Sequence, residues 1–319
     1  MIFRFISMLI GHQRILNFLK KSIEQKKIAH AYLFIGPENV GKKRMALEFI
    51  KMLIGVEIEK VFHPDVLLIE PKIVEKNGVK KEKEITIEEV RTIRHQIGLF
   101  PYQASYKIVL IDMAEQMTRD AANALLKTLE EPSGQAVLIL ITSKPQLLLP
   151  TIISRCQTIK FLPVPAEEIE KSLEQSKFHS PNLKKIVRLS GGRPGLALRY
   201  LENPSLIQAQ NQIISELQRL IQSDLNDRCQ YAEILSKNIA QARQTLGQWL
   251  IYFRDLLLLS ADCGNLVLFD SSFFRSEFFK KIPLARIKNI IKAIRKTDWL
   301  LANPSINARL ALEVLMLEF

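Results

Sequence analysis

Ala31-Tyr-Leu-Phe-Ile-Gly-Pro-Glu-Asn-Val-Gly-Lys-Lys43 is an apolar run followed by a glycine-bounded loop and two lysines. The apolar residues 31–35 predict a buried strand, and Lys42 is expected to open a helix. Gly36, four residues, Gly41 and Lys42 reproduce the phosphate-binding P-loop, in which backbone N–H groups and a helix N-terminus face an anion. The next residue in such loops is Ser or Thr, whose hydroxyl binds Mg²⁺. Lys43 stands there instead, so the stretch predicts a P-loop-type α/β fold with a defect at its metal position.

A second predicted strand, residues 107–111, ends at Asp112. An acidic residue at this point of such folds binds the metal ion, directly or through water. The following residue is often a Glu that polarises the attacking water, but here it is Met113. Losing such acid–base help typically costs about 10²–10⁴ in rate. The sequence therefore has the framework of an ATPase and two defects in its chemistry.

Strands and amphipathic helices alternate through the first half of the chain, which predicts a parallel sheet with helices on both faces. The phosphate loop and Asp112 then lie at the carboxyl ends of the strands, where ligands bind in such sheets. Asn77-Gly78 predicts an inserted, solvated hairpin. The predicted helices are 13–27, 42–54, 87–98, 118–131 (stopped by Pro132) and 147–154, and the predicted strands are 31–35, 66–69, 107–111, 137–141 and 157–161.

Pro163 and Pro165 mark a domain boundary. We expect an α/β domain over residues 1–162 and a small helical domain of three short helices over 163–204. No strand pattern recurs after Asn203-Pro204. Helical segments at 205–222, 227–260, 284–302 and 305–318 predict an all-helical third domain over 205–319.

The composition narrows the class of protein but not its partner. The net charge of +12 suits nucleic acid and equally suits a basic, solvated surface, and the same two readings apply to the lysines and arginines of 284–300. The three cysteines form no CxxC pair, which favours the cytoplasm. No apolar run approaches the roughly 20 residues that span a bilayer. We interpret residues 1–10 as a structural segment rather than a signal peptide.

Four local strings occur in order between residues 10 and 200. They are His30-Ala-Tyr-Leu-Phe-Ile-Gly-Pro37, His63-Pro-Asp65, Asn123-Ala-Leu-Leu-Lys-Thr-Leu-Glu-Glu-Pro132 and Leu149-Pro-Thr-Ile-Ile-Ser-Arg-Cys-Gln157. Together they resemble the clamp-loader branch of the AAA+ ATPases, and in this order they are highly specific. Within the branch the chain most resembles the delta-prime stators of bacterial DNA polymerase III, which are related to the gamma/tau motor subunits.

The resemblance implies an AAA+ α/β domain, a helical lid and an all-α collar. It also implies a degenerate nucleotide site, either left empty or binding ATP or ADP weakly, with no cofactor required. The residues of that site are Gly36, Gly41, Lys42, Lys43 and Asp112.

Two further features of the family are altered in this chain. The lid arginine that contacts the γ-phosphate in motor subunits aligns near Gly195. The four zinc-binding cysteines common in the family are missing from the short stretch Leu53–His63. We therefore expect no bound metal and no zinc.

Arg155 lies in an intact Ser154-Arg155-Cys156 triplet. The resemblance implies that this arginine is a finger reaching the ATP site of a neighbouring subunit, an interaction that can be worth about 10³–10⁵ in rate. An ion pair with a carboxylate of the same chain is the alternative. Cys156 is expected to be a packing residue rather than a nucleophile.

These features predict a non-hydrolysing, cytoplasmic stator of a hetero-pentameric clamp loader. Its expected partners are gamma/tau and delta subunits, with the sliding clamp contacted indirectly, primer-template DNA met in the assembled complex, and no membrane. One alternative is an ATP-hydrolysing gamma/tau-like motor, but Lys43 and Met113 argue against hydrolysis. Another is a DNA-binding module unrelated to clamp loading, which the charge alone suggests.

Overall fold

The computed structural model describes residues 9–55, 63–76, 79–98, 100–131, 135–176, 180–274, 282–303 and 305–319. The interpretation of residues 1–8, the Asn77-Gly78 turn and the helix stop at Pro132 lie outside these ranges. The chain divides into two compact units. One comprises Met1–Val187 with Gly191–Ala197, and the other Arg188–Ser190 with Leu198–Phe319. This division does not test the two predicted boundaries between the three domains, which stay predictions.

A five-stranded parallel sheet forms the centre of the first unit, in the order β2-β5-β6-β1-β7. The three central strands are almost entirely buried, because helices cover both of their faces. The predicted parallel sheet is confirmed. Its strands are β1 (Ala31–Ile35), β2 (Val66–Ile69), β5 (Lys107–Ile111), β6 (Ala136–Thr142) and β7 (Gln157–Lys160).

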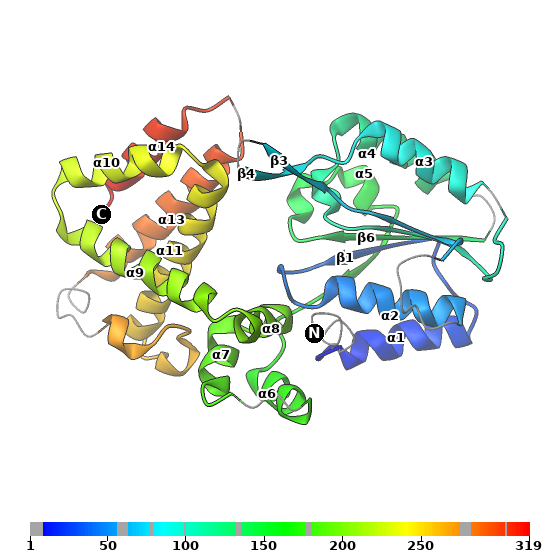
Figure 1. Ribbon diagram of the computed structural model, residues 1–319, viewed down its shortest axis with the longest axis horizontal. Coiled ribbons are helices and arrows are strands. Elements are labelled where there is room, and N and C mark those ends of the chain that lie inside the picture. Colours follow the sequence, from blue (N-terminus) through cyan, green and yellow to red (C-terminus); the bar gives the residue numbers. More distant parts are fainter. Residues whose placement is uncertain are drawn as a thin grey trace. The chain divides into compact units, whose positions relative to one another are not determined.

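Two helical layers enclose this sheet (Figure 1). Successive residues of a strand point to opposite faces. Tyr32 and Phe34 therefore join the core under α1 and α2, while Leu33 joins the core under α3, α4 and α5. The helices of the first layer are α1 (Gln13–Glu24) and α2 (Lys42–Ile54), and those of the second are α3 (Ile87–Ile97), α4 (Arg119–Glu130) and α5 (Pro150–Ile153).

Side-chain caps fix where the second-layer helices begin. Thr86 and Glu89 form a reciprocal capping box at the start of α3. The Thr118 hydroxyl accepts a hydrogen bond from the Ala121 N–H at the start of α4, as the sequence predicted. The predicted hairpin is also confirmed, since β3 (Lys72–Lys76) pairs antiparallel with β4 (Val79–Lys83).

Three short helices follow the sheet, as predicted from the sequence. They are α6 (Ala166–Gln175), α7 (Leu183–Ser190) and α8 (Pro194–Glu202). Residues 191–197 belong to the first unit, so the beginning of α8 is part of the same compact unit as the phosphate loop.

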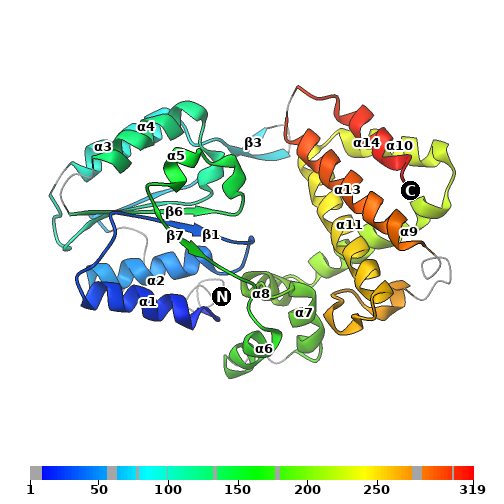
Figure 2. The ribbon, with the colours of Figure 1, turned by 180° about the vertical axis from the view of Figure 1, so that it is seen from behind.

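The second unit is helical throughout its described residues (Figure 2). The single helical segment predicted over 227–260 is wrong. It is broken at Asn238, whose backbone is extended and whose side chain caps the next helix by accepting from the Gln241 N–H. The helices of the second unit are α9 (Ser205–Gln222), α10 (Leu225–Ser236), α11 (Ile239–Ser260), α13 (Leu284–Leu301) and α14 (Ala308–Met316), with short 3-10 turns at Gly264–Leu266 and Ser271–Phe274. Among the described residues, none of the helices combines the length and the hydropathy that crossing a membrane requires.

Candidate functional site

The phosphate loop leaves the carboxyl end of β1 and enters α2 at Lys42. Gly41 is the N-cap residue of that helix and has a left-handed backbone with a φ of 112°. Glycine adopts this conformation without steric cost, and other residues rarely do. The loop therefore has the backbone that its glycine spacing predicted.

Lys42 is buried and folded back onto the loop that precedes it. Its Nζ donates hydrogen bonds to the Gly36 carbonyl at 2.6 Å and to the Pro37 carbonyl at 2.7 Å. Burial lowers the pKa of Lys42, and the charges of Glu115, Glu38 and Asp112 oppose that shift. The ammonium that would meet a phosphate is thus held by two backbone carbonyls of its own loop.

Lys43 bridges two carboxylates at the same edge of the sheet. Its Nζ lies 2.6 Å from Glu70 Oε2 and 3.0 Å from Asp112 Oδ2. Glu70 directly follows β2 and Asp112 directly follows β5, and these two strands pair side by side. Burial by itself would lower the pKa of Lys43, but the hydrogen bonds and charges of Glu70 and Asp112 together raise it above its usual value. Lys43 therefore stays cationic at physiological pH.

Residues implied to hold Mg²⁺ do not fit that ion here. Magnesium requires near-octahedral oxygen ligands at about 2.0–2.1 Å. Lys43 supplies an ammonium in place of a hydroxyl, and one oxygen of Asp112 faces that ammonium. The other oxygen of Asp112 accepts a hydrogen bond from the Met113 N–H at 3.0 Å. In the described part of the chain, no group of three or more His, Cys, Asp or Glu side chains could hold a metal ion.

Glu115, which sequence reasoning missed, lies in the short 3-10 turn Ala114–Gln116 after β5. One of its oxygens accepts from the Ser143 hydroxyl at 2.9 Å and from the Ser143 N–H at 3.3 Å. Its other oxygen, Oε2, is buried and has no hydrogen-bond partner among the described residues. Ser143 directly follows β6, and Glu70 directly follows β2. Both residues could therefore have been found by asking which residues stand at the carboxyl ends of the predicted strands.

Gly195, at the start of α8, contacts the phosphate loop directly. Its N–H donates to the Asn39 carbonyl at 2.8 Å, and a Cβ at this position would lie 2.9 Å from that same oxygen. Gly195, near which we expect the lid arginine of motor subunits to align, therefore has no side chain, and this allows the backbone contact. A larger residue here must displace either the loop or the helix.

Arg155 lies at the opposite edge of the sheet. It precedes β7, which runs parallel to β1, so it lies at the amino ends of the strands while the phosphate loop lies at their carboxyl ends. The five residues of β1 separate the two by roughly 15 Å. The predicted site residues are consequently in two places, with Lys42, Lys43 and Asp112 at one edge and Arg155 at the other.

The guanidinium of Arg155 has two partners in the same chain. It lies 2.7 Å from Glu130 Oε1, the last residue of α4, and donates to the Thr151 carbonyl at 3.1 Å. The intramolecular ion pair considered from the sequence is thus present. Both side chains are partly exposed, at 35% for Arg155 and 49% for Glu130. An exposed pair of this kind contributes little stability, so a stronger anion can replace the carboxylate.

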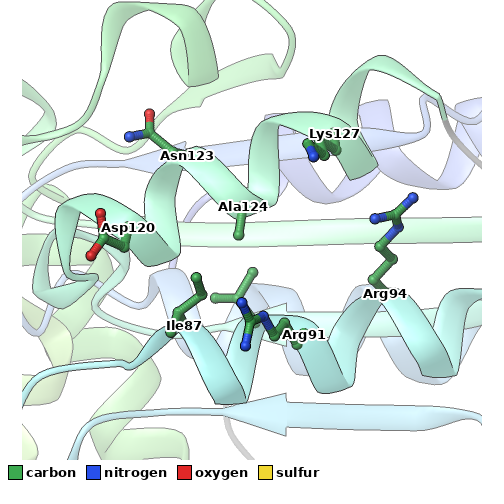
Figure 3. A pocket seen from close by; sticks show the side chains of 8 residues that line it. Ile87, Arg91, Arg94, Asp120, Asn123, Ala124 and Lys127 are labelled. Atoms are coloured by element: carbon green, nitrogen blue, oxygen red, sulfur yellow. The ribbon is translucent and has the colours of Figure 1, made fainter.

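A groove between α3 and α4 carries three basic side chains (Figure 3). It encloses about 460 Å³, and Arg91, Arg94 and Lys127 line it together with Asp120 and Asn123. Arg94 and Lys127 reach in from the two helices near one end of the groove. This concentration of positive charge suits a chain of phosphates.

Comparison with known proteins supports the resemblance inferred from the sequence strings. Residues 11–165 match a family model described as DNA polymerase III, delta subunit. The delta-prime subunit of DNA polymerase III from Bacillus subtilis (strain 168) is 31% identical over 215 residues, which are 63% of this chain and 62% of that protein. The delta-prime subunit from Pseudomonas aeruginosa is 32% identical over 216 residues, 62% of this chain and 63% of that protein.

A tau subunit and a gamma subunit-related protein are also similar to this chain, at lower identity. The tau subunit of Bacillus subtilis (strain 168) is 28% identical over 323 aligned residues, covering 90% of this chain and 56% of that protein. A gamma subunit-related protein of known structure from Thermotoga maritima is 22% identical, covers 95% of this chain and 97% of its own, and superposes with a TM-score of 0.48. The chain thus spans under two thirds of the length of the delta-prime and tau relatives that it matches.

Proposed function

We propose that this chain, a relative of the delta-prime and tau/gamma subunits of bacterial DNA polymerase III, is a non-hydrolysing stator of a clamp loader. In this role it occupies one position of a hetero-pentameric ring with motor and delta subunits and donates Arg155 to the ATP site of a neighbour. The ring loads the sliding clamp onto primed DNA.

The observation that carries this proposal is the distance between the two parts of the predicted site. Arg155 lies at the amino edge of the sheet, away from its own phosphate loop, so it cannot assist chemistry in its own subunit. Its guanidinium is partly exposed and is held by an exposed carboxylate, both of which suit transfer to an anion on another subunit. A fixed guanidinium neutralises charge developing on a transferring phosphoryl group.

The phosphate loop supports the stator over the motor. Lys43 replaces the metal-binding hydroxyl and bridges the two carboxylates, Met113 offers no carboxylate, and Gly195 offers no guanidinium. We therefore propose that any ATP or ADP binds weakly and is not hydrolysed.

Arg155→Ala in a ring reconstituted with the cognate motor and delta subunits tests the finger. The variant should assemble normally by gel filtration and should lower ATP hydrolysis stimulated by clamp and primed DNA. Arg155→Lys, which keeps the charge but loses the planar fork, should lower turnover as well. Arg14→Ala, which removes an exposed arginine of α1, is the matched control. Unchanged turnover in an assembled Arg155→Ala ring would remove the finger role.

One observation favours the alternative, an ATP-hydrolysing motor. Glu115 supplies a carboxylate with an unpartnered oxygen at the carboxyl edge of the sheet, two residues after Met113. ATP binding by calorimetry and phosphate release by the isolated chain, with and without Mg²⁺, separates the two proposals. The stator predicts no turnover. Magnesium-dependent turnover that is lost in both Lys42→Ala and Glu115→Gln would establish the motor instead.

The second unit offers a surface for the neighbouring subunits. Leu310 and Val314 lie four residues apart on α14, and Leu317 is its C-cap residue; these three are between 55% and 64% exposed, and Trp299 on α13 is 74% exposed. We propose that this apolar surface contacts other collar domains of the ring. Leu310→Glu with Val314→Glu should abolish ring assembly while leaving the helical content unchanged. A normal ring from this variant would remove the surface from the proposal.

Primer-template DNA is the proposed occupant of the groove between α3 and α4. Neutralising Arg91, Arg94 and Lys127 together should weaken DNA binding by the assembled ring equally for all sequences. It should also lower the slope of log K against log salt by up to about 3, one for each phosphate contact. An unchanged slope would exclude this groove as a DNA contact.

A further inference from the structure

Two carboxylates, those of Asp112 and Glu70, lie at the carboxyl ends of the strands, and the Lys43 ammonium is ion-paired with both. Asp112 and Glu70 end adjacent strands, and an ion at this edge of a P-loop fold would lie between them and the phosphate loop. Lys43 Nζ takes that position, at 3.0 Å from Asp112 and 2.6 Å from Glu70. Each oxygen of Asp112 has a partner, because the Met113 N–H donates to the second one.

We propose that the Lys43 ammonium is a tethered replacement for the divalent metal ion of this fold. It neutralises both carboxylates and excludes Mg²⁺ from the phosphate loop. This inference does not require the chain to be a stator, because it concerns the charges at one edge of one sheet.

Three features of the geometry support it. The ammonium belongs to the second residue of α2, and its contacts with Glu70 and Asp112 hold it at the carboxyl ends of β2 and β5. Its carboxylate partners directly follow two neighbouring strands, β2 and β5, whose pairing brings them to the same side of the ammonium's helix. A divalent cation within a few ångströms of the ammonium would be strongly repelled, and Lys43 provides no oxygen ligand to offset that repulsion.

The test is a titration of the full chain with Mn²⁺, in which the electron paramagnetic resonance signal of free Mn²⁺ measures how much remains unbound. The wild-type chain should bind no Mn²⁺ at this edge. Lys43→Thr restores a hydroxyl and frees both carboxylates, and it should bind Mn²⁺ at least about tenfold more tightly than the wild type, given the size of the repulsion removed. Lys43→Gln, which removes the charge and keeps a polar side chain one atom shorter, should show a gain in the same direction and serves if the threonine variant folds poorly.

Two controls identify where the metal binds. Lys51→Thr removes another lysine of α2, paired with Glu48 rather than with the site, and should behave like the wild type. Lys43→Thr combined with Asp112→Asn should lose the gained affinity.

The proposal is overturned by any of three outcomes. They are wild-type binding as tight as in Lys43→Thr, no gain in either Lys43 variant, or a gain that persists after Asp112→Asn. Because the titration uses the lone chain and measures no turnover, each outcome leaves the proposed stator role to its own test.

Discussion

Replacing Asp65 by Asn should destabilise the first unit severely. Asp65 is 1% exposed and ion-paired with the Lys107 ammonium at 2.7 Å, and its two oxygens also accept from the N–H groups of Tyr102, Gln103 and Ala104. Breaking a buried ion pair from one side leaves an uncompensated charge, which costs about 3–5 kcal/mol. That loss is a large share of the roughly 5–15 kcal/mol that stabilises a typical domain.

The pH dependence of stability should carry the same signature. Burial alone would raise the pKa of Asp65, but Lys107 and the three backbone donors hold the pKa far below its usual range. A carboxyl with a depressed folded-state pKa contributes stability above its unfolded pKa and loses it as the pH falls. Wild-type stability should therefore decrease below about pH 4, and the Asp65→Asn chain should show less of this decrease.

Urea denaturation followed by far-UV circular dichroism measures the effect. Both tryptophans, Trp249 and Trp299, lie in the second unit, so fluorescence gives an internal control that should shift little. Lys107→Met alone and combined with Asp65→Asn completes a double-mutant cycle, and the double variant should be clearly more stable than the sum of the single losses implies. Additive losses, or a loss below about 1 kcal/mol for Asp65→Asn, would refute the buried-pair reasoning.

The remaining predictions concern single side chains near the two sites. Gly195→Ala should destabilise the first unit by about 1–3 kcal/mol, because its Cβ would meet the Asn39 carbonyl oxygen. Gly247→Ala, in a helix with open space around it, should instead stabilise the second unit by about 0.5–1 kcal/mol. An unchanged urea midpoint for Gly195→Ala would contradict the contact. Burial lowers the pKa of His12, and its hydrogen bond to the phosphate loop opposes that shift. The neutral imidazole therefore contributes stability above the unfolded pKa near 6.5, and this contribution should be lost as the pH falls from about 7 to 5. The loss should be smaller in His12→Asn, and parallel melting curves for the two chains would count against it. Burial raises the pKa of the Cys156 thiol to about 12. Iodoacetamide at neutral pH should therefore alkylate Cys156 more slowly than the other two cysteines, which mass spectrometry can measure. Equal alkylation rates would argue against its burial.

Much of the first unit could be predicted from the sequence because its signals are local. The apolar runs of β1, β5 and β6 predict buried strands, and Gly41 predicts the left-handed start of α2. The caps at Thr86 and Thr118 are each set by residues three positions apart. The His63-Pro-Asp65 string predicts a turn before the strand 66–69 and belongs to the resemblance, but the role of its buried carboxylate in ordering the loop before β5 is visible only in the structure.

The rest depends on which strands lie side by side, which no local pattern contains. Glu70 and Ser143 are unremarkable in the sequence, and they join the site only because β2 and β6 are neighbours of β5. Asn238 was missed for the opposite reason. The helical pattern continues on both sides of it, so its role as an N-cap becomes visible only in its backbone conformation.

The folded-back Lys42 lies in the path of any phosphate that enters the loop by pairing with its ammonium. A phosphate that pairs with this ammonium must displace the two carbonyls that now hold it, so binding requires the loop to open. If about 1% of molecules are open, the apparent affinity is reduced about a hundredfold relative to the open form. Association would then level off at high ligand concentration, at the speed of loop opening rather than of diffusion, which gives the loop a kinetic gate made from its own side chain.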